Sequence, residues 1–332
     1  MHACNLIANS QANSPLHTQV VDNSGSMNIG DGSRLLHTKK DVKVVNCTRW
    51  AEMQQTVIFH SEMAALLQAP TVFRLLNDPG KAAGNQQFGI AEFNKNSIAE
   101  DLEIAKSTIT KAGPAGVTPL SARLLEIRDN IMQLAPRLRR DGTRVAIILA
   151  TDGLPTNPSG TCSSYTRDQF VEALRSLEGL PVWVVIRLCT DEKDVVEFYN
   201  DLDHQLELSL EVLDDFFQEA KELYKYNKWI NYALPLHRCR EMGYHNRLFD
   251  LMDERKLTKD EVKGYFDFLF GEESTQSMPN IHSDWRGFLE SAQRLVDVES
   301  KQWNPITKKL APWIDLKKLN KEYGTGKGCT LM

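Results

Sequence analysis

The stretch RVAIILATDG, residues 144–153, contains six consecutive apolar residues and then a carboxylate at Asp152. An uninterrupted apolar run of this length is typical of a strand that is buried on both faces in a parallel sheet. The stretch VWVVIRL, residues 182–188, has the same character. These two stretches therefore predict the centre of a sheet that helices cover on both sides.

The flanking segments extend this sheet. Weaker strands are predicted at 18–21, 71–76 and 88–93, the last two paired across a turn-rich segment, and an alternating edge strand at 206–213. Helical spacing of apolar residues predicts helices near 50–67, 120–134, 167–177 and 192–202. The second of these helices is expected to stop or kink before Pro136. The alternation predicts an α/β fold with a doubly wound, mostly parallel sheet.

The pattern changes after residue 215. No further strand is predicted, and residues 216–319 are helix-patterned, with breaks at Pro279, Pro305 and Pro312. Four of the six tryptophans fall in this part, which indicates a packed core rather than a disordered extension. We therefore expect a flexible N-terminus at 1–15, an α/β domain at 16–228, a helical domain or cap at 229–320 and a flexible tail at 321–332.

Composition narrows the class of protein. With 42% hydrophobic and 25% charged residues, the chain of 332 residues is typical of a globular protein, and its net charge of −5 is too small to indicate a nucleic-acid surface. The six cysteines have no metal-binding or disulfide-framework spacing, which favours a reducing compartment. No signal peptide and no run of eighteen apolar residues occurs. These features predict a soluble cytoplasmic protein that does not bind nucleic acid.

Three oxygen-bearing side chains follow the first strand at every second position. They are Asp22, Ser24 and Ser26 in the stretch VVDNSGSMNIGDG, residues 20–32. Alternate residues of an extended loop point the same way, and Gly25 is expected to allow a tight turn there. Oxygen donors with few charges suit Mg²⁺, with Mn²⁺ or Ca²⁺ as alternative ions, and the absence of thiols and imidazoles disfavours zinc.

Two further segments are expected at the same edge of the sheet. Thr118 precedes Pro119 in a glycine-rich loop, which places Thr118 at the predicted N-cap of the helix that follows. Asp152 comes directly after the central strand. Because ligands bind beyond the carboxyl ends of parallel strands, both side chains are candidates to join the three oxygens of the first loop.

These motifs, in this order, resemble the metal-ion-dependent adhesion site of the von Willebrand factor A domain, over roughly residues 16–226. The resemblance implies that Asp22, Ser24, Ser26, Thr118 and Asp152 supply the metal's oxygen ligands, some of them through water. It also implies a six-stranded Rossmann-like sheet with one antiparallel strand. The sixth metal position is then left for an aspartate or glutamate carboxylate of a partner protein, so the resemblance implies binding rather than catalysis.

Some features depart from this pattern or leave alternatives open. The first strand is short and carries the polar residues His17 and Gln19. The segment after the first loop is long, and a long loop beside a site is a candidate specificity loop. Its Asp31 is a further candidate metal ligand. A Mg²⁺-dependent phosphohydrolase is the rival function, although Ser24 stands where enzymes that open with Asp-x-Asp have a second acid. A scaffold with a vestigial site is the third alternative.

The last four residues, CTLM, match a prenylation signal at Cys329, and the final methionine favours a farnesyl group. Lys317, Lys318, Lys321 and Lys327 supply the basic charge that a single lipid needs for stable attachment. The sequence therefore predicts attachment to the cytoplasmic face of a membrane.

Overall fold

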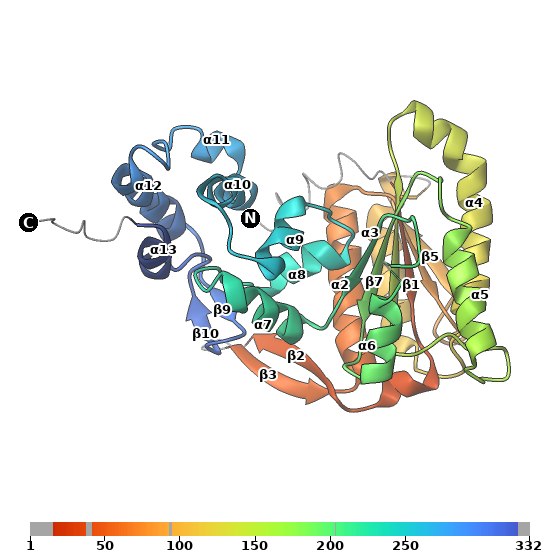
Figure 1. Ribbon diagram of the computed structural model, residues 1–332. Helices are drawn as coiled ribbons and strands as arrows, with labels where there is room; N and C mark the ends of the chain where they lie inside the picture. Colours follow the sequence, from red (N-terminus) through yellow and green to blue (C-terminus); the bar gives the residue numbers. More distant parts are fainter. Residues whose placement is uncertain (1–15, 38–41, 93–94, 203, 325–332) are drawn as a thin grey trace, which may run out of the picture. The chain divides into compact units, whose positions relative to one another are not determined.

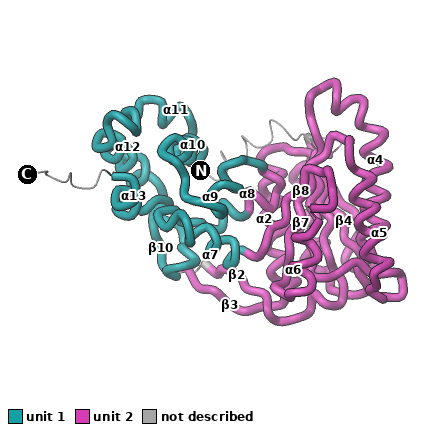
Figure 2. The backbone as a smooth tube through the Cα atoms, viewed as in Figure 1, with its two compact units in different colours: residues 1–6, 216–237, 245–332 teal, residues 7–215, 238–244 magenta. Residues whose placement is uncertain are grey.

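The computed structural model describes residues 16–37, 42–92, 95–202 and 204–324. This part of the chain forms two compact units (Figure 2). Unit 2 contains residues 16–215 and 238–244, and unit 1 contains residues 216–237 and 245–324. Residues 216–228, which the sequence prediction gave to the first domain, thus lie in unit 1. The expectations for the N-terminus and for Cys329 concern residues outside the described part.

Unit 2 is built on a six-stranded sheet with the order β5-β4-β1-β6-β7-β8 (Figure 1). The strands are β1 (Leu16–Val21), β4 (Thr71–Leu75), β5 (Gln87–Ile90), β6 (Val145–Thr151), β7 (Val182–Leu188) and β8 (Leu210–Leu213). All neighbouring pairs are parallel except β4 and β5. Every residue of β6 and β7 is buried. The predicted α/β class, the six strands and the doubly buried centre are confirmed.

Helices cover both faces of this sheet. One apolar cluster joins it to α4 (Leu120–Arg140), α5 (Ser164–Arg175) and α6 (Lys193–Asn200). A second cluster joins its other face to α2 (Arg49–Leu67) and α3 (Ile98–Lys111). Of the two outcomes predicted before Pro136, a stop or a kink, the stop is wrong, because α4 continues to Arg140. Proline is tolerated there because the next residues, including the buried Leu138, pack on the core and sustain the last turn.

The polar side chains of β1 are buried rather than exposed, and segment 238–244 explains why. The ring of His17 contacts the carbonyl of Met242 at 3.1 Å, and Nδ1 of His60 lies 2.9 Å from the amide oxygen of Gln19. Gly243 adopts φ +83°, and a β-carbon there would approach Ala146 to 3.0 Å. The backbone of this segment therefore lies directly on the sheet.

Ion pairs hold the same segment in place. Glu241 accepts from Arg187 of β7 at 3.0 Å and from Arg238 at 2.7 Å, and Arg187 also pairs with Glu52 of α2. Burial lowers the pKa of His60 to about 3 in these surroundings. Because His60 is neutral and the buried charges are paired, these polar side chains can be buried between the sheet and segment 238–244, where apolar side chains would otherwise pack.

The segment between the first loop and α2 is not the long loop that the sequence predicted. Residues 32–37 and 42–47 form an antiparallel hairpin of β2 (Gly32–His37) and β3 (Val42–Cys47). Leu35 is buried, and the backbone N–H of Ser33 donates to Glu52 of α2 at 2.9 Å. These contacts attach the hairpin to α2.

Unit 1 is mainly helical. Its elements are α7 (Phe216–Tyr226), α9 (Arg247–Glu254), α10 (Lys259–Phe270), α11 (Glu272–Thr275), α12 (Trp285–Val298) and α13 (Leu316–Tyr323), with α8 (Leu234–Glu241) shared between the units. Trp229, Trp303 and Trp313 are buried, as expected for core residues. The prediction that strands end before this region is wrong, because β9 (Gln302–Asn304) and β10 (Lys309–Ala311) form a hairpin. Three-residue strands are too short to give an alternating pattern.

None of the helices in the described part of the chain has the length and apolar character needed to cross a bilayer.

Candidate functional site

Asp22 is the first residue after β1, at the carboxyl edge of the sheet. Its carboxylate is fully buried, and it accepts hydrogen bonds from the backbone N–H of Ser24 at 2.8 Å and from the hydroxyl of Thr151 at 2.6 Å. Its own N–H donates to the carbonyl of Ala150 at 2.9 Å. Because β1 and β6 are parallel neighbours, these bonds fix Asp22 beside the loop that follows β6.

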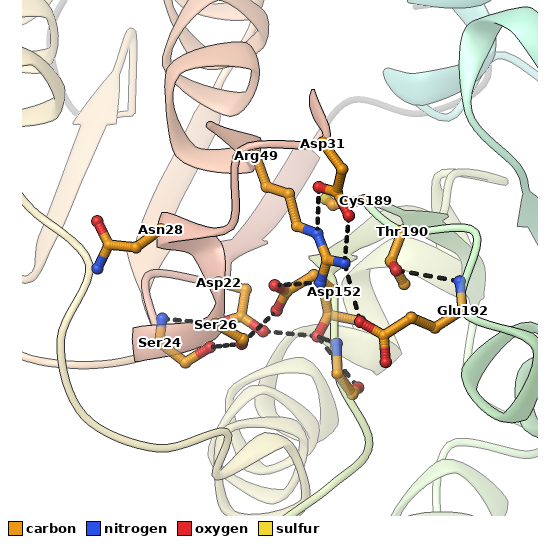
Figure 3. Close-up of polar contacts among 12 residues, drawn as sticks. Asp22, Ser24, Ser26, Asn28, Asp31, Arg49, Asp152, Cys189, Thr190 and Glu192 are labelled. Atoms are coloured by element: carbon orange, nitrogen blue, oxygen red, sulfur yellow. Dashed lines mark hydrogen bonds and ion pairs between the residues drawn. The ribbon is translucent and has the colours of Figure 1, made fainter. Parts of the chain in front are cut away.

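The oxygens of the first loop connect to that second loop (Figure 3). The hydroxyls of Ser24 and Ser26 lie 3.0 Å apart, and Ser26 donates to Oδ1 of Asp152 at 2.8 Å. Residues that are 126 positions apart in the sequence thus meet in one polar cluster. The structure brings together four of the five predicted side chains, Asp22, Ser24, Ser26 and Asp152, through direct contacts.

Thr118 lies next to this cluster. A β-carbon on Gly153 would be 3.6 Å from its hydroxyl oxygen, and no hydrogen bond of that hydroxyl to another described residue is present. The N-cap of α4 is Pro119, so the prediction that Thr118 caps the helix is wrong. Two hydrogen bonds instead link its backbone to Thr156. The N–H of Thr118 donates to Oγ1 of Thr156 at 2.9 Å, and the N–H of Thr156 donates to the carbonyl of Thr118 at 3.0 Å. Those bonds fix the backbone of Thr118 beside the loop that follows β6.

The glycine that this arrangement requires is Gly116 rather than Gly25. Gly116 has φ +85°, and a β-carbon on it would approach Oδ1 of Asn77 to 2.6 Å. Its carbonyl accepts from the N–H of Gly25 at 3.2 Å, which ties the two loops together. Gly25 is the first residue of a short 3-10 helix, η1 (Gly25–Asn28). Its φ is not positive, so its backbone conformation does not require a glycine.

Arg49, at the start of α2, contacts carboxylates from three loops (Figure 3). Its guanidinium donates to Asp152 at 3.0 Å and to Glu192 at 2.9 Å. Two further bonds, of 2.8 and 2.7 Å, go to the two oxygens of Asp31. Only 2% of the Arg49 side chain is exposed, whereas Asp31 and Glu192 are largely solvated. Asp31, the additional candidate ligand, is therefore engaged by Arg49.

The charges in this cluster do not balance. The cluster has four carboxyl groups, those of Asp22, Asp31, Asp152 and Glu192, and the guanidinium of Arg49 pairs with the last three of them. Burial and, to a lesser extent, the Asp152 charge raise the pKa of Asp22, the hydrogen bonds from Thr151 and Ser24 lower it, and the net result is a pKa of about 6. Burial also raises the pKa of Asp152, although Arg49 lowers it. Asp31, in contrast, has a lowered pKa because it is hydrogen-bonded to Arg49.

The donor set fits a hard divalent cation. It consists of two buried carboxylates and three hydroxyls, without nitrogen or sulfur, and the excess of negative charge at Asp22 and Asp152 is what such a cation would neutralise. Among the described residues, no group of three or more His, Cys, Asp or Glu side chains is placed to hold a metal. That finding concerns a different kind of site, because hydroxyls make up most of the set here.

Sequence reasoning missed Arg49, Glu192 and Thr151. Thr151 is the last residue of β6 and Glu192 precedes α6, and neither carries a recognisable signal of its own. Arg49 did carry a signal in the sequence. A cation in the first turn of a helix interacts unfavourably with the helix dipole, so nearby carboxylates are expected to compensate it.

Comparisons with known proteins add little. No family model matches the sequence, and no curated protein matches it. Among solved structures, a mutant of the PilB minor pilin from Streptococcus sanguinis is similar, with 16% identity and a TM-score of 0.40. The match covers 61% of this chain and 57% of that structure, so the chain spans less than two thirds of its length. Similarity at this level carries no argument about fold family or function.

Proposed function

We propose that unit 2 is a protein-interaction module of the von Willebrand factor A type, which holds Mg²⁺ at the carboxyl edge of its sheet and captures a carboxylate of a partner protein. Asp22, Ser24, Ser26, Thr118 and Asp152 would supply the oxygen ligands, some of them through water. The sheet order with a single antiparallel edge strand and the convergence of the three loops both support this assignment.

One observation carries the proposal. Asp22 is fully buried, yet among the described residues no Lys, Arg or His lies within ion-pair distance of its carboxylate. A buried carboxylate without a counter-charge is costly, and its raised pKa reflects that cost. A bound dication would remove it. Arg49, the nearest cation in the cluster, is instead shared among Asp152, Asp31 and Glu192.

The same charge balance favours a carboxylate as the captured group. A dication held by two carboxylates and neutral hydroxyls, one carboxylate already paired with Arg49, keeps residual positive charge toward solvent. An aspartate or glutamate side chain of a partner would complete its coordination.

Binding is favoured over hydrolysis by the side chains beside the cluster. Cys189 is among the residues drawn at the site in Figure 3, but burial raises the pKa of its thiol to about 12, so it is protonated at neutral pH. Tyr199 donates its hydroxyl to the carbonyl of Gly153 at 2.9 Å, and burial raises its pKa well above the usual value. Neither group is suited to attack or to accept a proton.

Calorimetric titration of the full chain with MgCl₂ tests the metal site. We expect binding by the wild type and loss of at least ten-fold in affinity in Asp22→Ala and Asp152→Ala. Asp129→Ala is the matched control, because Asp129 is an exposed carboxylate on α4 that pairs only with Arg128. Equal Mg²⁺ binding by all four proteins would reject the proposal.

A further inference from the structure

A groove runs between α4 and α5 in unit 2. Its volume is about 650 Å³, which lies in the range of ligand-binding clefts. Pro119, Ala122 and Leu125 of the α4 side and Pro158 and Ala173 of the α5 side give it apolar walls. We call this cleft the α4–α5 groove.

Two residues that line the groove adjoin the candidate metal site. Pro119 follows Thr118 in the chain, and Thr156 is linked to Thr118 through the two backbone hydrogen bonds described above. A chain that places a carboxylate at the metal therefore has the groove beside it. The exposed Leu125 lies five residues into α4, or roughly 7.5 Å along its axis, which two or three residues of an extended peptide span.

Two large side chains of the groove are exposed. Leu125 is 37% exposed and Tyr165 is 67% exposed. The Tyr165 hydroxyl accepts from the side chain of Gln169, one turn further along α5, at 3.1 Å. An exposed leucine and an exposed aromatic ring that line the same cleft can receive an apolar side chain.

The charges of the groove select the rest of the ligand. Arg128 pairs with Asp129, and Glu172 pairs with Arg175. Asp168 is exposed, and within the described part of the chain no cationic side chain lies within ion-pair distance of it. The unbalanced charge of the groove is thus negative and favours a cationic group.

We propose that the α4–α5 groove binds the residues that neighbour the metal-binding carboxylate of the partner. The ligand is a linear peptide segment with an acidic residue at the metal, an apolar residue two or three positions away in contact with Leu125 and Tyr165, and a basic residue beyond it opposite Asp168. This inference rests on the proposed function and specifies its ligand.

Fluorescence anisotropy of the full chain with labelled synthetic peptides tests this inference. The probe peptide contains one aspartate, a leucine two positions later and a lysine two positions beyond that, and it is compared with peptides carrying serine for the leucine or glutamate for the lysine. With Mg²⁺ present, we expect the leucine-to-serine peptide and the Leu125→Glu protein each to bind roughly ten-fold more weakly. Met132→Glu is the matched control, since Met132 is exposed on the same helix but does not line the groove.

A charge exchange separates recognition from structural damage. Asp168→Lys should weaken binding of the lysine peptide about five-fold and restore binding of the glutamate peptide, because only a direct contact can be rescued by reversing both charges. No rescue, or equal weakening by Met132→Glu, would overturn the inference.

The metal controls distinguish the two proposals. Peptide binding that is lost in excess chelator but unaffected by Leu125→Glu and Asp168→Lys would keep the proposed function and reject the groove as part of its ligand site. Binding that persists in chelator and in Asp22→Ala would reject the proposed function, and with it this inference. Self-association of the peptide-free chain in sedimentation velocity, abolished by Leu125→Glu, would assign the groove to a second copy of the chain and overturn the peptide assignment.

Discussion

Replacing Asp22 with asparagine should stabilise the metal-free protein, although it removes a residue of the site. A carboxyl whose pKa is 3.8 in the unfolded chain and about 6 in the fold binds more protons when folded. Its contribution to stability is complete below pH 3.8 and is lost as the pH rises to about 6, which amounts to about 3 kcal/mol. Asparagine carries no charge and escapes this loss.

The net gain is smaller than that. The amide oxygen of asparagine can still accept from the N–H of Ser24, but its NH₂ group replaces the oxygen to which Thr151 donates. The hydroxyl of Thr151 must then rotate to accept, and one strained hydrogen bond costs about 1 kcal/mol. We therefore expect Asp22→Asn to raise the free energy of unfolding by about 2 kcal/mol at pH 7 in chelator.

Magnesium should reverse the order of the two proteins. A ligand that binds only the folded state adds RT ln(1 + [L]/Kd), or about 2.7 kcal/mol at a hundred-fold excess over Kd. The wild type gains this stability and Asp22→Asn does not. Urea unfolding of the full chain, in chelator and in Mg²⁺, measures both effects, with Asp129→Asn as the control for a solvated carboxylate.

The pH dependence provides the internal check. In chelator, Asp22→Asn should be more stable than wild type by about 2 kcal/mol above pH 6. Below pH 3.8 the ionisation term is absent, and the altered Thr151 hydrogen bond should leave Asp22→Asn about 1 kcal/mol less stable than wild type. If Asp22→Asn is less stable than wild type at pH 7 in chelator, or if the difference does not change with pH, Asp22 is not the uncompensated carboxylate on which the proposed function depends.

Four further outcomes are expected. Burial lowers the pKa of His60 from 6.5 to about 3, so the unfolded chain binds more protons than the folded chain between these pH values. The free energy of unfolding should therefore fall by up to about 1.4 kcal/mol per pH unit as the pH drops from 6.5 toward 3. Urea unfolding of His60→Gln should lack this slope. Arg49→Ala leaves Asp152 buried without its cation and should cost about 3 kcal/mol in chelator but less in Mg²⁺, which unfolding curves in the two buffers compare. Gly116→Ala forces φ +85° on a residue with a β-carbon and should cost about 1–2 kcal/mol in the same assay and weaken Mg²⁺ binding measured by calorimetry. Mass spectrometry of the chain from a eukaryotic host should find a farnesyl group at Cys329 and none in Cys329→Ser, and an unmodified wild-type terminus would reject the lipid anchor.

The sequence by itself determined the class of fold and the positions of the six strands along the chain. The apolar run of β6 can only be buried on both faces, and alternating strands and helices build a parallel sheet whose loops open at one edge. Asp22, Ser24, Ser26 and Asp152 could be grouped for this reason, since each follows a strand of that sheet. Local pattern and chain topology were enough to place them.

Tertiary structure alone decided what surrounds these residues. His17 and Gln19 contradicted a buried first strand until the fold supplied their partners, the carbonyl of Met242 for His17 and the ring of His60 for Gln19. The hairpin of β2 and β3 depends on its packing against α2. The link from Arg49 to Asp31, Asp152 and Glu192 joins side chains that are distant in sequence, and a charge can be recognised as unbalanced only when all of its neighbours are known.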